Sequence, residues 1–187
     1  MIRIISGECK GRRLKTLKGR AVRPTSDRAK QTLFDILQDR INGCNFLDLF
    51  SGSGGIGFEA ASRGAGEVYL IESDPNAMKI IKENAVLCGF GKNVSVYEMD
   101  CGQSLRRISK EKKTFDLIFL DPPYTDHAAY ELIEIVGEEG LLSKGGLVIA
   151  EHDRRHALPK SFGVLRMLRT RRVGDTVFSF YGGDVEK

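Results

Sequence analysis

Residues 48–57 read DLFSGSGGIG, and this stretch is the strongest indication of the fold. It overlaps the end of the apolar run 46–50, which predicts a strand, and it leads into a helical pattern over 56–63. Its glycines fit the pattern G-x-G-x-x-G, in which a missing Cβ lets the backbone turn sharply and come close to a ligand. A strand, a glycine loop and a helix in this order predict a parallel sheet with a ligand at the carboxyl end of the strand.

Short apolar runs alternate with helical patterns along the rest of the chain, which predicts a doubly wound α/β fold of the Rossmann-like type. The last two runs have no helix between them, so we expect an antiparallel C-terminal hairpin on a mostly parallel, seven-stranded sheet. A helix N-cap at 24–27 (PTSD) should start a helix that ends near 41. The expected strands are 46–50, 67–72, 94–98, 115–120, 146–151, 163–169 and 176–181, and the expected helices are 56–63, 75–88, 102–109 and 128–138.

The N-terminal segment is expected to be a basic β-hairpin arm over 1–24, followed by one compact domain over 25–187. Residues 1–30 have ten Lys or Arg against two acids, a net charge of +8, whereas the whole chain has +4. A second block, 154–172, has seven Lys or Arg and no acid. Such blocks favour phosphate contacts, although a solvated charged surface is the ordinary alternative. The residues expected to contact nucleic acid are Arg12, Arg13, Arg20, Arg23, Thr25 and Arg28.

Composition argues against metal, disulfide and membrane functions. The four cysteines lie far apart, which predicts reduced thiols, and the three histidines show no metal-ligand spacing. The sequence has no run of eighteen apolar residues and no pattern of a secretory signal. We therefore expect a cytoplasmic protein with no metal and no membrane partner.

Acidic residues follow the first three predicted strands. Asp48 precedes the glycine loop, where a carboxylate suits a cationic amino group, such as that of S-adenosylmethionine, better than a pyrophosphate. Glu72 is placed to accept hydrogen bonds from ribose hydroxyls. A nicotinamide dinucleotide would require the same acidic residue. Asp100 is placed to accept from an adenine amino group, with an ordinary loop aspartate as the alternative. The residues expected to bind the cofactor are Asp48, Phe50, Ser51, Gly52, Ser53, Gly54, Glu72, Ser73, Asp100 and Cys101.

The stretch DPPY at 121–124 follows the fourth predicted strand. Its two prolines fix the backbone and remove two amide donors, so mainly acceptors remain. The Asp121 carboxylate and the carbonyl near Pro122 would accept from one NH₂ group, and Tyr124 would stack on a base. A rigid surface turn is the alternative, but it rarely joins a strand-end acid and an aromatic ring beside a glycine loop. The residues expected to be catalytic are Asp121, Pro122, Pro123 and Tyr124.

Together these motifs resemble the RsmD family of class I S-adenosylmethionine-dependent methyltransferases. The resemblance runs over nearly the whole chain, although the family often has alanine at the position of Ser51. It implies methyl transfer from S-adenosylmethionine, leaving S-adenosylhomocysteine, to the exocyclic N2 of a guanine in small-subunit ribosomal RNA. We further expect a monomer that acts on an assembling small subunit. The motifs are RPT at 23–25 with Arg28, LF at 33–34, DLFSGSG at 48–54, EA at 59–60, SRGA at 62–65 and DPPY at 121–124.

Other functions fit part of this pattern. An adenine-N6 methyltransferase acting on DNA or RNA would use the same acceptor pair, and only the resemblance separates it from a guanine-N2 enzyme. A nicotinamide oxidoreductase leaves 121–124 and the basic arm unexplained. A cytosine-C5 methyltransferase needs a cysteine in its catalytic loop, and none lies near 121–124. A non-catalytic RNA-binding assembly factor would not need intact cofactor and catalytic loops.

Overall fold

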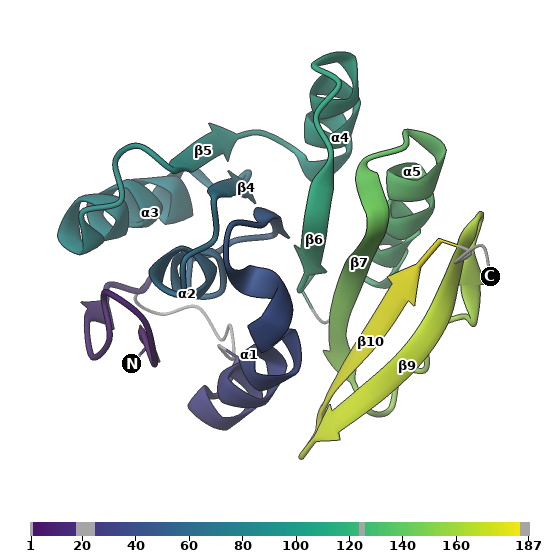
Figure 1. The fold of residues 1–187 in the computed structure, drawn as a ribbon, viewed down its shortest axis with the longest axis horizontal. Helices are drawn as coiled ribbons and strands as arrows, with labels where there is room; N and C mark the ends of the chain where they lie inside the picture. The colour runs from purple at the N-terminus through teal and green to yellow at the C-terminus, as the bar shows by residue number, and fades with distance from the viewer. Residues whose placement is uncertain (1, 18–24, 124–125, 184–187) are drawn as a thin grey trace.

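The computed structural model describes residues 2–17, 25–123 and 126–183, and it has the doubly wound α/β architecture (Figure 1). The main sheet contains β3 Asn45–Leu49, β4 Glu67–Glu72, β5 Val94–Glu98, β6 Phe115–Leu120, β7 Leu142–Asp153, β8 Ser161–Phe162, β9 Leu165–Val173 and β10 Thr176–Gly182. Their spatial order is β5-β4-β3-β6-β7-β10-β9-β8. The strands from β5 to β7 are parallel, and β10, β9 and β8 extend the sheet in antiparallel pairs. The α/β fold class and the C-terminal hairpin are thereby confirmed.

Helices cover both faces of this sheet (Figure 1). They are α1 Asp27–Ile41, α2 Gly57–Ser62, α3 Pro75–Cys88, α4 Cys101–Lys110 and α5 Leu132–Glu138, with the 3₁₀ helix η1 His127–Glu131 before α5. Because side chains of a strand alternate, Phe46 of β3 joins the core under α1, α2 and α3, whereas Leu47 joins the core under α4 and α5. Within the described ranges, none of the helices has both the length and the apolar character needed to cross a bilayer.

Helix ends follow the chemistry expected from the sequence. The Ser26 hydroxyl accepts from the amide of Ala29 at 3.1 Å and caps α1. Asp74 caps α3, Pro75 occupies its first turn, and Gly89 ends it at φ 75°. These signals place the loop after β4 and the start of α3 at the carboxyl edge of the sheet.

The expected N-terminal hairpin is present, with β1 Ile2–Arg3 antiparallel to β2 Arg13–Leu14. It is anchored to α2 by Glu59, a fully buried carboxylate. This group accepts from the amides of Ile5 (2.7 Å) and Ser6 (3.0 Å) and from Nε of Arg63 (2.7 Å). The hairpin is therefore docked on the domain through buried, charge-assisted hydrogen bonds.

Gly7 allows the hairpin backbone to pack closely against Ser62 at the end of α2. It has φ 81°, and a Cβ at this position would lie 1.7 Å from the Ser62 carbonyl oxygen. The neighbouring amide of Glu8 donates to that same oxygen at 2.8 Å, and the amide of Cys9 donates to the Ser62 hydroxyl at 2.9 Å. Only glycine fits both the backbone angle and the contact.

Three differences from the sequence expectation have physical causes. β7 begins at Leu142 rather than 146. Gly145, at φ 77°, does not interrupt the strand; instead, the pairing of β7 with β6 shifts its register at this point. β9 runs to Val173 rather than 169, because its last residues stay paired with β10 although the exposed Arg169, Arg171 and Arg172 interrupt the apolar pattern. The two-residue strand β8, too short to recognise from its apolar pattern, is an eighth strand in the sheet.

Candidate active site

A cavity of about 270 Å³ opens at the carboxyl ends of β3 and β6. This is the edge of a parallel sheet at which ligands bind, and β3 is the strand where the strand order reverses. The cavity brings together the glycine loop, the N-terminal hairpin, the start of α1 and the end of β6. Its lining residues are Ile2, Thr16, Leu17, Thr25, Lys30, Asp48, Phe50, Ser51, Gly52, Ser53, Gly55, Ile56, Ala77, Phe119 and Asp121.

Asp48 joins the cavity to the glycine loop. Its side chain is buried, and Oδ2 accepts from the amide of Gly57 at 3.0 Å, at the start of α2. The Ser51 hydroxyl donates to the Asp48 carbonyl at 2.7 Å, and Phe50 between them has φ 64°. Burial raises the pKa of Asp48 to about 8. A ligand ammonium in the cavity would lower that pKa and stabilise the carboxylate.

Glu72 holds the loop from the neighbouring strand. One carboxylate oxygen accepts from the amide of Gly52 at 2.9 Å, and the other accepts from those of Ser73 and Asp74, each at 2.8 Å. Glu72 does not line the cavity of about 270 Å³, although the glycine that it holds does. A carboxylate has about four lone-pair sites, so the group can still accept from ribose hydroxyls.

Asp100 and Cys101 do not line this cavity. Asp100 caps α4 by accepting from the amide of Gln103 at 3.1 Å. Cys101 is packed in the apolar core that contains Leu105, and burial raises the pKa of its thiol to about 12. The thiol is therefore protonated at neutral pH and is no nucleophile. The expected contacts of Asp100 and Cys101 with an adenine ring stay predictions.

Three carboxyl groups form a row along the ends of adjacent strands, namely Asp48 on β3, Asp121 after β6 and Glu151 on β7. The register pairs Leu120 with Ala150, so the next positions, Asp121 and Glu151, are neighbours. Burial and the carboxylates of Glu151 and Asp48 raise the pKa of Asp121 well above its ordinary value. Burial also raises the pKa of Glu151 to about 7. The row therefore attracts cationic or NH-donating ligands, which would stabilise its charged form.

Glu151 and Lys30 belong to the site and were not expected from the sequence. Glu151 is 3% exposed and accepts from the Thr25 hydroxyl at 2.7 Å, which ties β7 to the start of α1. Lys30 is 2% exposed and lies 3.3 Å from a carboxylate oxygen of Glu59. The strand-end position that singled out Asp48 and Asp121 would also have found Glu151 had it been applied to the fifth strand. No comparable signal marks Lys30.

Similarity to known proteins extends over nearly the whole chain. The family model described as Conserved hypothetical protein 95 matches residues 2–182. A Bacillus subtilis protein named Putative rRNA methyltransferase YlbH is 37% identical over 180 residues, which cover 96% of this chain and 98% of that relative. The chain belongs to this family, the RsmD family.

Two further matches agree with this membership of the RsmD family. The Haemophilus influenzae protein named Ribosomal RNA small subunit methyltransferase D is 32% identical over 167 residues, which cover 88% of this chain and 86% of that relative. A solved structure described as Putative methyltransferase yhhF from Escherichia coli has a TM-score of 0.85 at 29% identity and covers 99% of both chains. The resemblance inferred from the motifs is confirmed.

The structure of this RsmD-family chain describes the predicted catalytic motif, residues 121–124, up to Pro123. Pro122 is buried and Pro123 is exposed, and the Pro123 carbonyl accepts from the amide of Asp126 at 2.8 Å. This bond turns the chain into η1. Tyr124 lies outside the described residues, so its stacking role stays a prediction.

The basic residues expected to contact RNA take different places in this RsmD-family structure. Thr25 lines the cavity, whereas Arg13 and Arg28 are exposed on the hairpin and on α1. The Arg12 guanidinium donates to the Leu87 carbonyl at the end of α3, so it also fastens the hairpin. Arg20 and Arg23 lie outside the described residues. The division at residue 24 into an arm and a domain also stays a prediction.

Proposed function

We propose that this RsmD-family protein transfers a methyl group from S-adenosylmethionine to the exocyclic N2 amino group of a guanine in small-subunit ribosomal RNA. The observation that carries the proposal is the row of Asp48, Asp121 and Glu151 beside a glycine-loop cavity. The names of the relatives, which include Ribosomal RNA small subunit methyltransferase D, support the RNA substrate.

The residues of the cavity fit S-adenosylmethionine. Asp48 would bind its ammonium, because the carboxylate is buried at the cavity wall and is oriented by the amide of Gly57. Glu72 would accept from the ribose hydroxyls while it keeps the amide of Gly52 in place. When bound, S-adenosylmethionine supplies a methyl group on a positively charged sulfur, which is already activated for transfer. The protein therefore has to position a nucleophile rather than activate the methyl group.

Asp121 would hold and orient the guanine amino group. The N2 lone pair is delocalised into the ring, so the amino group becomes a nucleophile only when it is held and partly pyramidalised. The Asp121 carboxylate and the carbonyl near Pro122 supply two acceptors for its two protons. These acceptors are fixed by a strand end and two prolines before the reaction starts, so they stabilise the transition state without reorganisation.

Glu151 would raise the pKa of Asp121, the acceptor for the amino group. Its carboxyl group neighbours Asp121 and is oriented by the Thr25 hydroxyl at 2.7 Å. The pKa of Asp121 is raised chiefly by burial and next by Glu151, so Asp121 can take the proton that the amino group loses as it is methylated. The proton then stays within the Asp121–Glu151 pair or passes to water.

The finer features of the substrate are also proposals. We infer that the RNA is presented in an assembling small subunit, and that the protein acts as a monomer in the cytoplasm. The exposed positive charge of Arg13 and Arg28 near the cavity edge supports contact with ribosomal RNA.

Nucleoside mass spectrometry tests the proposed reaction. Purified protein and S-adenosylmethionine are incubated with small-subunit ribosomal RNA, free or in subunits, from cells that lack the gene. N2-methylguanosine is the expected product. N6-methyladenosine instead would indicate the adenine enzyme, and no methylated nucleoside in either substrate would overturn the proposal.

A further inference from the structure

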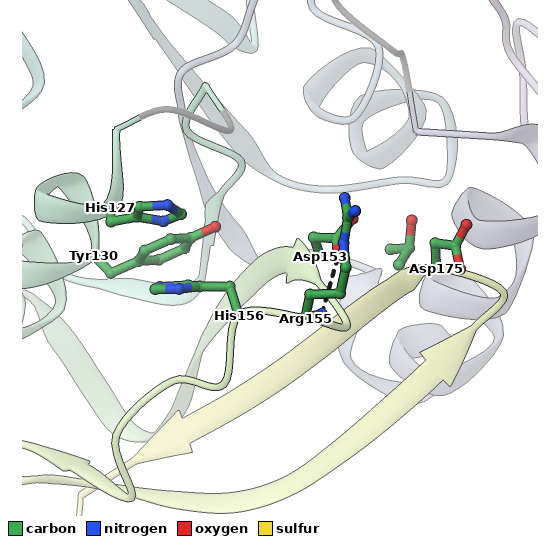
Figure 2. Close-up of a pocket in the computed structure, with 7 residues that line it drawn as sticks. His127, Tyr130, Asp153, Arg155, His156 and Asp175 are labelled. Carbon is green, nitrogen blue, oxygen red and sulfur yellow. Dashed lines mark hydrogen bonds and ion pairs between the residues drawn. The ribbon is translucent and has the colours of Figure 1, made fainter.

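A second pocket, of about 500 Å³, lies at the same edge of the sheet and shares no lining residue with the cofactor cavity among the described residues (Figure 2). We call it the histidine pocket; it is lined by His127, Tyr130, Asp153, Arg155, His156, Asp175 and Thr176. It is built by η1, the end of β7 and the start of β10. Because β7 neighbours β6 and η1 follows the DPPY loop closely in the chain, the pocket adjoins the place proposed for the target guanine.

One wall of the histidine pocket is a stack of flat rings. The ring centroids of His127 and His156 are 4.0 Å apart at 26°, and those of Tyr130 and His156 are 5.8 Å apart at 27°. Tyr130 is buried, and its hydroxyl donates to the carbonyl of Glu151 at 2.7 Å, which fixes the base of the stack. His127 is exposed, so an imidazole face is open to a ligand (Figure 2).

The opposite wall holds one oriented guanidinium group, that of Arg155. Asp153 accepts from Nε of Arg155 at 2.8 Å and from Nη2 at 3.1 Å. The Arg155 side chain is 83% exposed although it is held in place. Figure 2 shows the rings and this ion pair on separate sides of the pocket. A guanidinium has five N–H donors, so Arg155 retains donors for a phosphate or a base edge.

We propose that the histidine pocket binds an RNA base next to the target guanine by stacking it on the His127–His156 pair, with Arg155 on its phosphate. This inference rests on the proposed RNA substrate. Flat rings beside fixed cations are the combination by which proteins bind unpaired bases and their backbone. The size also suits a nucleotide, since ligand pockets span roughly 300–1,000 Å³. A metal ion is a poorer occupant, because the described residues contain no cluster of three or more His, Cys, Asp or Glu able to hold one.

The test uses a single-stranded RNA oligonucleotide in which 2-aminopurine stands beside one guanine. With the parent protein, fluorescence of the 2-aminopurine should be quenched because the base stacks on the rings. His127→Ala and His156→Ala should each lower the RNA affinity by about 5- to 100-fold and relieve the quenching. His127→Phe should restore both, since a phenyl ring also stacks. Arg155→Ala should also lower the RNA affinity, because Arg155 contacts the phosphate, and Arg106→Ala, which removes an exposed arginine on α4, is its matched control.

The outcomes separate the pocket from the proposed reaction. Parental affinity and parental quenching in both alanine variants would overturn the pocket assignment, provided that the parent methylates ribosomal RNA. If the parent methylates no RNA, the proposed function fails first. Loss of affinity in His127→Phe to the same degree as in His127→Ala would also contradict stacking, and circular dichroism of each variant shows whether the fold is kept.

Discussion

Asp121 and Glu151 lie side by side at the ends of two neighbouring parallel strands, one position beyond the pair Leu120–Ala150. Asp121 is half-buried and Glu151 is buried, and burial raises the pKa of each. Two such groups at adjacent positions cannot both be ionised at low energy. The pair is therefore both an acceptor for an amino group and a store for the proton that the reaction releases.

This pair predicts how stability depends on pH. Glu151 has an ordinary pKa of 4.5 and a folded pKa of about 7. The folded protein keeps a proton on Glu151 that the unfolded chain loses. The stability that the protonated group provides is therefore fully present below pH 4.5 and is lost as the pH rises to 7. Relative to the parent, Glu151→Gln should gain about 1–3 kcal/mol of unfolding free energy between about pH 4.5 and 7.5.

Urea denaturation at several pH values measures this effect. Glu138→Gln, which replaces an exposed glutamate on α5, is the matched control. The unfolding free energy is plotted against pH for each protein. A Glu151→Gln plot that stays parallel to the parental plot over this range would show that Glu151 is ionised in the folded protein as freely as in water.

Cofactor affinity should depend on Glu72. Glu72→Ala removes an acceptor for ribose hydroxyls and also frees the amide of Gly52, so we expect S-adenosylmethionine to bind about 10- to 150-fold more weakly. Calorimetric titration measures the dissociation constant. Glu98→Ala is the matched control, because Glu98 occupies the position opposite Glu72 on β5 and is exposed. Equal affinities in the two variants would remove Glu72 from the cofactor site.

The hairpin offers a test of its docking. Gly7→Ala should lower the unfolding free energy by about 2–5 kcal/mol, because a Cβ would meet the Ser62 carbonyl oxygen at 1.7 Å in a left-handed conformation. Gly11→Ala has nearly the same φ, 83°, but open space around the Cβ, so it should lose only about 1–2 kcal/mol. Thermal denaturation compares the two. Equal losses would mean that Gly7 supplies backbone freedom alone.

Phosphate contacts should come from the exposed arginines of the hairpin and of α1. Arg13→Ala and Arg28→Ala should each reduce the log–log salt slope of RNA binding by about 0.7–0.9 for every phosphate that is no longer neutralised. Arg12→Ala should in addition lower stability, because its guanidinium donates to the Leu87 carbonyl. Filter binding at several salt concentrations gives the slopes. A salt slope unchanged in the Arg13 and Arg28 variants would make this surface solvated rather than RNA-binding.

Much of the fold was predictable because its signals are local. β4, β5, β6 and α3 have the predicted bounds, since a proline, a glycine or an acid stands at the boundary of each apolar pattern. β9 was harder to predict, because exposed arginines interrupt its apolar pattern. The predicted start of β7 was wrong because Gly145 and Gly146 look like a break in the sequence but allow the strand to continue with a register shift.

The site was predictable where an acidic residue lies at the carboxyl end of a strand. Asp48 and Asp121 are predictable in this way, and both line the cavity. Glu151 ends the predicted strand 146–151, so the same rule would have found it, although β7 itself continues to Asp153, paired with β10. Lys30 reads as a solvated residue of an amphipathic helix, and only the folded hairpin and Glu59 bury it. Contacts between distant segments leave no local pattern to read.

Alignment of the guanine amino group by Asp121 is the step on which the proposed reaction depends. The most direct test is the single-turnover rate of N2-methylguanosine formation with Asp121→Ala at saturating S-adenosylmethionine. We predict a rate about 10²–10³ lower than that of the parent, because one preorganised acceptor is removed, with S-adenosylmethionine affinity within a few-fold. A near-parental rate for Asp121→Ala would contradict this role of Asp121.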